Sequence, residues 1–84
     1  MNDALFNRWI ADCCVTGSNE AAAMIDLFQS WRTYAQAKGE YVWPGEKMRS
    51  FPSALKTAGF QRFSGRFGIR GRGYRGLSIK ETTH

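Results

Sequence analysis

Cysteine and histidine are scarce in this chain, which contains two of the first and one of the second. The cysteines, Cys13 and Cys14, are adjacent, and neighbouring residues are poorly placed for an ordinary disulfide. The only histidine is the terminal His84, and no second Cys or His pair completes a zinc site. We therefore expect reduced, mostly structural thiols, no metal and no other cofactor.

Long hydrophobic runs are also absent. No apolar stretch approaches the roughly 20 residues that are needed to cross a membrane. The first residues do not show a charged segment followed by an apolar one, the pattern that directs secretion. We therefore expect a cytoplasmic protein that does not bind a membrane.

Motifs of catalysis are missing as well. The chain has no phosphate loop of the form Gly-x-x-x-x-Gly-Lys-Ser/Thr, no readable pair of carboxylates, and no Ser/His/Asp or Cys/His set apart from the terminal histidine. With 84 residues it forms one small domain, too small to enclose a usual substrate pocket. The sequence therefore predicts a non-catalytic binding protein without a small-molecule substrate.

Positive charge is concentrated in the second half of the chain. Residues 1–45 contain three basic and five acidic residues, a net charge of −2, whereas residues 46–84 contain nine basic and two acidic residues, a net charge of +7. This asymmetry predicts a polyanionic partner, most simply nucleic acid. An ordinary solvated basic surface is the alternative interpretation.

Apolar residues recur at helical spacing in three segments. The first covers about residues 3–14, and the second about residues 20–38, after a break at residues 16–19 and before a predicted C-cap at Gly39. The third covers about residues 45–58 and stops at Gly59. Because proline lacks an N–H and clashes with the preceding turn, this helix either kinks at Pro52 or begins near Ser50 with Pro52 in its first turn.

After Gly59 the pattern changes from helical to alternating. Phe63, Phe67 and Ile69 fall on one side, and Leu77 and Ile79 repeat the alternation after a break at residues 71–73. This pattern predicts a β-hairpin with a glycine-rich loop, packed on the helices through its apolar side.

Three helices followed by a basic hairpin is the order of a winged helix-turn-helix. In this α+β fold the third helix enters the DNA major groove, and the C-terminal β-hairpin is the wing that lies along the backbone or in the minor groove. We therefore predict a single winged-helix DNA-binding domain over residues 1–80, with a frayed tail at residues 81–84.

The predicted DNA contacts lie on the third helix and on the wing. On the helix, a step of 100° per residue places a polar face opposite Phe51, made of Arg49, Ser53, Lys56 and Thr57. On the wing, arginines can neutralise phosphates, and one aromatic residue of the predicted loop can contact a sugar, phosphate or base; these residues are Arg66, Arg70, Arg72, Arg75 and Tyr74.

Two other functions fit parts of the same sequence. An Arg-Gly segment can bind RNA without being folded. Alternatively, Tyr41 and Trp43, which fall in a predicted loop, can dock the domain on a replication protein.

Four short segments resemble, in the same order, the C-terminal domain of phage- and plasmid-type primase-helicases, the poxvirus-like superfamily-three replication proteins. They are Asp12-Cys13-Cys14-Val15; the helix Leu27-Phe28-Gln29-Ser30-Trp31-Arg32-Thr33-Tyr34 with the following Lys38-Gly39-Glu40; residues 51–60, which match Phe-x-x-x-Leu-x-x-x-Gly-Phe; and residues 72–77, which match Arg-Gly-aromatic-x-Gly-aliphatic. Pro52 and the connector at Pro44-Gly45 depart from the family's pattern.

This resemblance covers about residues 5–80. It implies a winged-helix domain that helps to recognise origin DNA and that contacts replication proteins or other domains of a primase-helicase. The primase and ATPase motifs of that family are absent from these residues, so the resemblance implies no enzymatic activity here.

Overall fold

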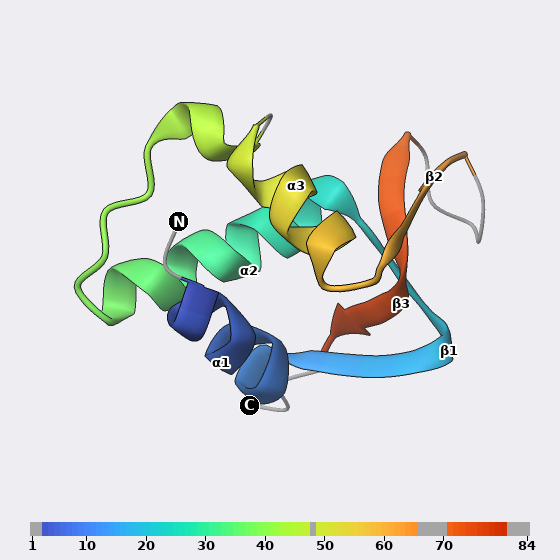
Figure 1. Ribbon diagram of the computed structural model, residues 1–84, viewed down its shortest axis with the longest axis horizontal. Helices are drawn as coiled ribbons and strands as arrows, with labels where there is room; N and C mark the ends of the chain where they lie inside the picture. Colours follow the sequence, from blue (N-terminus) through green and yellow to red (C-terminus); the bar gives the residue numbers. More distant parts are fainter. Residues whose placement is uncertain (1–2, 48, 66–70, 81–84) are drawn as a thin grey trace.

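A computed structural model describes residues 3–47, 49–65 and 71–80, which form three α-helices and a three-stranded antiparallel sheet (Figure 1). The α+β class, the three helices and the C-terminal hairpin are therefore confirmed. The predicted frayed tail, residues 81–84, lies outside the described residues. In chain order the elements are α1 (Asp3–Cys13), β1 (Cys14–Ala23), α2 (Met24–Ala37), the 3₁₀ turn η1 (Pro44–Lys47), α3 (Ser50–Thr57), β2 (Gln61–Ser64) and β3 (Arg72–Ile79).

Strand β1 stands where the sequence pattern predicts a loop and the first turn of a helix. The segment at residues 20–23, Glu-Ala-Ala-Ala, favours a helix by intrinsic propensity. In the structure it pairs instead with β3, which lies between β1 and β2 in the sheet. The prediction of a helix from residue 20 is therefore wrong: pairing with β3 overrides the local preference, and α2 begins at Met24.

The predicted ends of α2 and α3 are confirmed. Gly39 has a φ of 85°, and its N–H donates to the carbonyl oxygen of Gln36 at 3.0 Å. Gly59 has a φ of 99°, and the next N–H, that of Phe60, donates to the carbonyl oxygen of Leu55 at 3.1 Å. Both ends satisfy carbonyl groups that the helix itself leaves unpaired, as in the Schellman motif.

Of the two alternatives for Pro52, the later helix start is confirmed. Helix α3 begins at Ser50, so Pro52 is in the first turn, where a missing N–H removes no hydrogen bond within the helix. The residues before it form the separate turn η1, in which the Glu46 N–H donates to the Trp43 carbonyl at 3.1 Å.

An aromatic cluster holds the three helices together. Trp9 of α1, Trp31 of α2 and Phe51 of α3 are 0–2% exposed. The ring centroid of Trp9 lies 6.0 Å from that of Trp31 and 5.8 Å from that of Phe51, and the Phe6 ring packs edge-on against Trp31 and Phe51. Such tilted and edge-to-face contacts add to the free energy of burial. The cluster therefore determines where α3 lies relative to the other helices.

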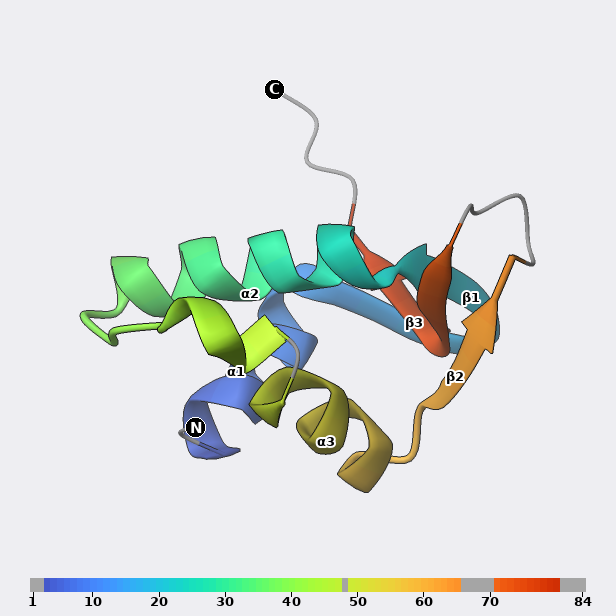
Figure 2. The same cartoon turned by 90° about the horizontal axis from the view of Figure 1, so that it is seen from above.

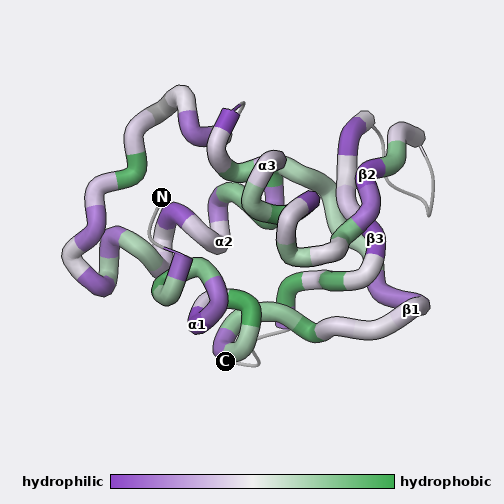
Figure 3. The backbone as a smooth tube through the Cα atoms, in the orientation of Figure 1, coloured by the Kyte–Doolittle hydropathy of each residue, from purple (hydrophilic) through white to green (hydrophobic). Residues whose placement is uncertain are grey.

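The sheet lies at one end of the molecule, beside α3 (Figure 2). Hydrophilic segments occur along β2 and the first part of β3, and Figure 3 draws them in purple, whereas the later part of β3 is green. The N–H of Gly65 donates to the carbonyl of Gly71 at 2.9 Å and closes the ladder of the hairpin. Arg72 and Gly73 already belong to β3, so the predicted break at residues 71–73 is wrong. Phe67 and Ile69 lie outside the described residues.

A bulge at Gly76 changes which side chains of β3 face the helices. Tyr74 and Leu77 are 3% and 0% exposed and both belong to the core, although residues three apart in a regular strand point to opposite faces. Gly76 has a φ of 101°, and the pairing with β1 shifts there, with residues 17–20 of β1 opposite it. The extra residues reset the alternation, so both side chains reach the same core.

No helix in the described ranges is long and apolar enough to cross a bilayer.

We expect Gly76→Ala to lower the free energy of unfolding by about 1–2 kcal/mol, because an L-residue is strained at this φ. The new Cβ would also lie 3.0 Å from the Phe60 ring. Gly17→Ala is the matched control: it lies in the same bulge without a positive φ, and its Cβ would meet only the Glu20 side chain, at 3.6 Å. Urea unfolding followed by circular dichroism measures both variants. An equal loss in the two would contradict this role of Gly76.

Candidate nucleic-acid interface

A hollow opens on the surface between α3 and the hairpin, and we call it the α3–hairpin hollow. Among the residues that the structure describes, its walls carry two cations, Lys56 from α3 and Arg62 from β2, and no carboxylate. The described residues that line it are Pro52, Ser53, Lys56, Phe60, Gln61, Arg62 and Tyr74. Two positive charges in one concave surface without a neighbouring acid form a site for an anion.

The pairing of β2 with β3 brings a third cation to the same side of the sheet. Arg62 is directly opposite Tyr74, and Ser64 is directly opposite Arg72. Opposed residues share a face, as do alternate residues along a strand. Because Tyr74 is buried in the core, these four residues belong to the face that turns toward the helices. Arg72 therefore lies on the same face as Arg62.

Tyr74 is not the exposed loop residue that the sequence predicts. It lies within β3, paired with Ala22 on one side and Arg62 on the other, and it is 3% exposed. The prediction fails because the alternation of β3 cannot be read across Gly76. Burial raises the pKa of Tyr74, and the nearby charges of Arg62 and Arg72 oppose that shift. The hydroxyl therefore keeps its proton at neutral pH and remains a hydrogen-bond donor.

The structure divides the wing arginines that the sequence groups together. Arg75 follows Tyr74 in the regular part of β3, so it belongs to the opposite face, and it is exposed. Arg72 and Arg75 therefore cannot meet the same phosphate group from one side of the sheet. Arg66 and Arg70 lie outside the described residues.

The predicted polar face of α3 is exposed, and the predicted inward residue Phe51 is fully buried. Ser53 and Lys56 line the α3–hairpin hollow. Thr57 lies on the other side of the helix axis, where it and Ser53 line a second hollow against α1. Arg49 is the exposed residue just before α3. Of these four residues, only Ser53 and Lys56 thus reach the hollow.

Arg62 is the site residue that the sequence prediction missed. The alternation around Phe63 contains the signal, because it places residue 62 on the same side as Ser64. Phe63 itself is directly opposite Gly73, and a Cβ on that glycine would lie 2.5 Å from the Phe63 ring. Phe63 is therefore on the face opposite Tyr74; it is buried, at 8% exposed, but does not belong to the core cluster that contains Tyr74 and Leu77.

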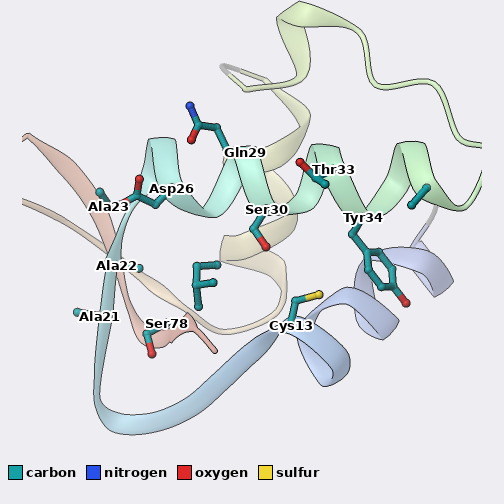
Figure 4. Close-up of a pocket in the computed structure, with 12 residues that line it drawn as sticks. Cys13, Ala21, Ala22, Ala23, Asp26, Gln29, Ser30, Thr33, Tyr34 and Ser78 are labelled. Carbon is teal, nitrogen blue, oxygen red and sulfur yellow. The ribbon is translucent and has the colours of Figure 1, made fainter. Parts of the chain in front are cut away.

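A different hollow lies along α2, β1 and β3 (Figure 4). Its described lining includes Asp26, Ser30 and Thr33 but no lysine or arginine. The Tyr34 side chain also lines it, and its hydroxyl donates to the Asp12 carboxylate at 2.8 Å. Because the α3–hairpin hollow is lined by two cations and this one by a carboxylate, a polyanion has more favourable electrostatics at the α3–hairpin hollow.

The two thiols are not suited to redox or nucleophilic chemistry. Cys14 is buried, and this burial raises its pKa to about 12. Cys13 is half-buried, and burial together with the charge of Asp12 raises its pKa as well. The reactive form of cysteine is the thiolate, and neither residue forms it readily at neutral pH.

Comparison of this chain with protein-family models, with curated proteins and with solved structures gave no match. Its function must therefore be inferred from the arrangement of its own residues.

We expect a disulfide reagent such as DTNB, at pH 8, to modify Cys13 more slowly than free cysteine and to leave Cys14 unmodified until the protein unfolds. The reason is that both pKa values are raised and Cys14 is only 4% exposed. Absorbance of the released thiolate, with and without guanidinium, measures the reaction. The variant Cys13→Ser isolates Cys14. Rapid modification of that variant in the folded state would contradict the prediction.

Proposed function

We propose that this chain is a winged-helix module that binds double-stranded DNA. In this proposal α3 enters the major groove, and the β2–β3 hairpin is the wing that follows the backbone. The observation that supports it most strongly is the α3–hairpin hollow, where Lys56 and Arg62 converge and none of the described lining residues is a carboxylate.

The proposed contacts follow from the position of each side chain. A DNA strand that crosses the hollow places phosphates against Lys56, Arg62 and Arg72, whose charges release counterions from the duplex. The exposed side chains of Arg49, just before α3, and Thr57, at its end, are available for phosphates or base edges. Arg66 and Arg70 stand between β2 and β3 in the sequence, and we propose them as additional phosphate contacts.

We further propose that the module acts in the cytoplasm, in replication of the phage or plasmid type, as the C-terminal DNA-recognition domain of a primase-helicase. Two of the segments with this resemblance coincide with the proposed site. Residues 51–60 comprise most of α3 and its C-terminal cap, and residues 72–77 comprise most of β3. Their match to the family's pattern supports this assignment.

The exposed aromatic residues of the α2–α3 connector favour a second candidate function, docking on a replication protein. Tyr41 is 77% exposed and Trp43 is 40% exposed. Aromatic side chains are enriched at protein–protein interfaces. If the connector carries the main function, binding to the partner survives high salt and affinity for duplex DNA is small even at low salt.

We expect Arg62→Ala to weaken binding to a short duplex about fivefold or more in 0.1 M salt and to flatten the salt dependence by about one phosphate contact. Arg75→Ala removes the same charge from the opposite face of the sheet and is the matched control, with an expected change below about twofold. Anisotropy of a fluorescent duplex of about 16 base pairs measures both. Equal losses in the two variants would show that only net charge matters and would reject the proposed interface.

For the unaltered protein we expect the logarithm of the association constant to fall with the logarithm of salt concentration with a slope of about −4 to −5. This slope corresponds to four to six phosphate contacts. The same titration with single-stranded RNA of equal length tests the RNA alternative. Tighter binding to that RNA than to the duplex would select RNA binding over the proposal.

A further inference from the structure

Tyr74 combines a buried ring with a hydroxyl that lacks an evident partner. The residue is 3% exposed and belongs to the core, yet it also lines the α3–hairpin hollow. Within residues 3–47, 49–65 and 71–80 its hydroxyl makes no hydrogen bond. The Tyr74 hydroxyl is not among the buried unpartnered side-chain atoms, which in the described residues are Trp31 Nε1 and Glu46 Oε2, so it is open to the hollow that it lines. A ligand in the hollow can therefore reach it.

Packing alone does not require this hydroxyl. A phenylalanine at position 74 would keep the ring against the core and the backbone pairing with Ala22 and Arg62. What distinguishes tyrosine is a polar group at the end of the ring, and that end points to the side of the sheet where the cations lie. The position therefore has a feature that the core by itself does not need.

The charged groups around the hydroxyl are donors. Lysine and arginine side chains donate hydrogen bonds and cannot accept them, so neither Lys56 nor Arg62 can receive the proton of the phenol. Among the described residues the lining contains no carboxylate, and its side-chain acceptors, Ser53 and Gln61, carry no charge. A ligand that neutralises Lys56 and Arg62 and also accepts from Tyr74 must supply negatively charged oxygen atoms.

We propose that the α3–hairpin hollow clamps one backbone phosphate of DNA, with the Tyr74 hydroxyl donating a hydrogen bond to a non-bridging oxygen. Lys56 and Arg62 neutralise the charge of that phosphate, and Ser53 lies beside it on α3. This inference rests on the proposed DNA binding. It adds that the Tyr74 hydroxyl determines where the DNA strand lies on the protein.

Tyr74 is suited to this positioning role because it is rigid. It lies in the central strand of the sheet, bonded to a neighbouring strand on each side, and its ring is fixed by the core. The long side chains of Lys56 and Arg62 lose more conformational freedom when they bind. A fixed donor specifies the position of a phosphate, and flexible cations add affinity. In this proposal, the position of β3 determines the distance between the DNA strand and α3.

The test is Tyr74→Phe, measured by duplex anisotropy as above. A hydrogen bond to a charged group corresponds to about tenfold in affinity or more, so we expect about a tenfold loss. The salt slope should stay unchanged because the substitution removes no charge, whereas Arg62→Ala flattens it. Tyr34→Phe is the matched control, since its hydroxyl donates to Asp12 and Tyr34 is not among the described residues that line the α3–hairpin hollow, and we expect no change in binding there.

A second measurement uses the unaltered protein and does not depend on the folding of a variant. The ¹³Cζ chemical shift of a tyrosine ring responds to hydrogen bonding of its hydroxyl. On titration with the duplex we expect the Tyr74 signal to move together with the amide signals of α3, and the Tyr34 signal to stay in place.

The outcomes separate the clamp from the proposed function. If Arg62→Ala weakens binding while Tyr74→Phe binds like the unaltered protein and the Tyr74 signal does not move, the clamp is rejected and DNA binding stands. If the unaltered protein does not bind the duplex at low salt, both are rejected. A tenfold loss in Tyr74→Phe with an unchanged salt slope and a moved Tyr74 signal supports the clamp.

Discussion

Strand β3 is the element on which the rest of the structure depends, because it pairs with β1 on one side and with β2 on the other. It contributes Leu77 and Tyr74 to the core, and it carries Arg72 toward the helices. The strand can do all of this only because the bulge at Gly76 resets the alternation of its side chains. The orientation of the hairpin relative to α3 is therefore a consequence of how β3 meets the core.

The aromatic cluster positions α3, as β3 positions the hairpin. Trp9, Trp31 and Phe51 come one from each helix, and Phe51 ties α3 to the helices that carry the acidic residues. Helix α3 is only eight residues long, too short to be stable on its own. Its exposed face is thus presented by tertiary packing. The proposed contacts at Lys56, Arg62 and Arg72 lie on elements that pack together in the fold, and such preorganisation favours binding because little conformational entropy is lost.

The concentration of cations around the hollow opposes folding and favours binding. Lys56 and Arg62 repel each other, and no acid among the described lining residues reduces that repulsion. A phosphate would remove it, so a nucleic acid that binds there would also stabilise the folded domain.

Local signals made several elements readable in the sequence. Gly39 and Gly59 predicted the ends of α2 and α3 because a left-handed residue satisfies the last carbonyl groups of a helix. Pro52 limited α3 to two possible starts, one of which the structure has. The inward face of α3 and the existence of a basic hairpin followed from periodicity alone. Strand β1 could not be predicted from local signals, because Glu20 and the three alanines after it favour a helix by intrinsic propensity. Only the backbone pairing with β3 makes this segment a strand.

The sequence by itself determined the composition of the proposed binding surface: a basic second half, a short third helix and an arginine-rich hairpin. Tertiary structure alone decided which of those residues act together, because the face of each side chain depends on long-range pairing and on one left-handed glycine in the central strand. Those interactions placed Arg62 and Tyr74 at the hollow and turned Arg75 away from it. Periodicity describes a strand only up to its next bulge, and the position of a bulge is set by the strand that pairs with it.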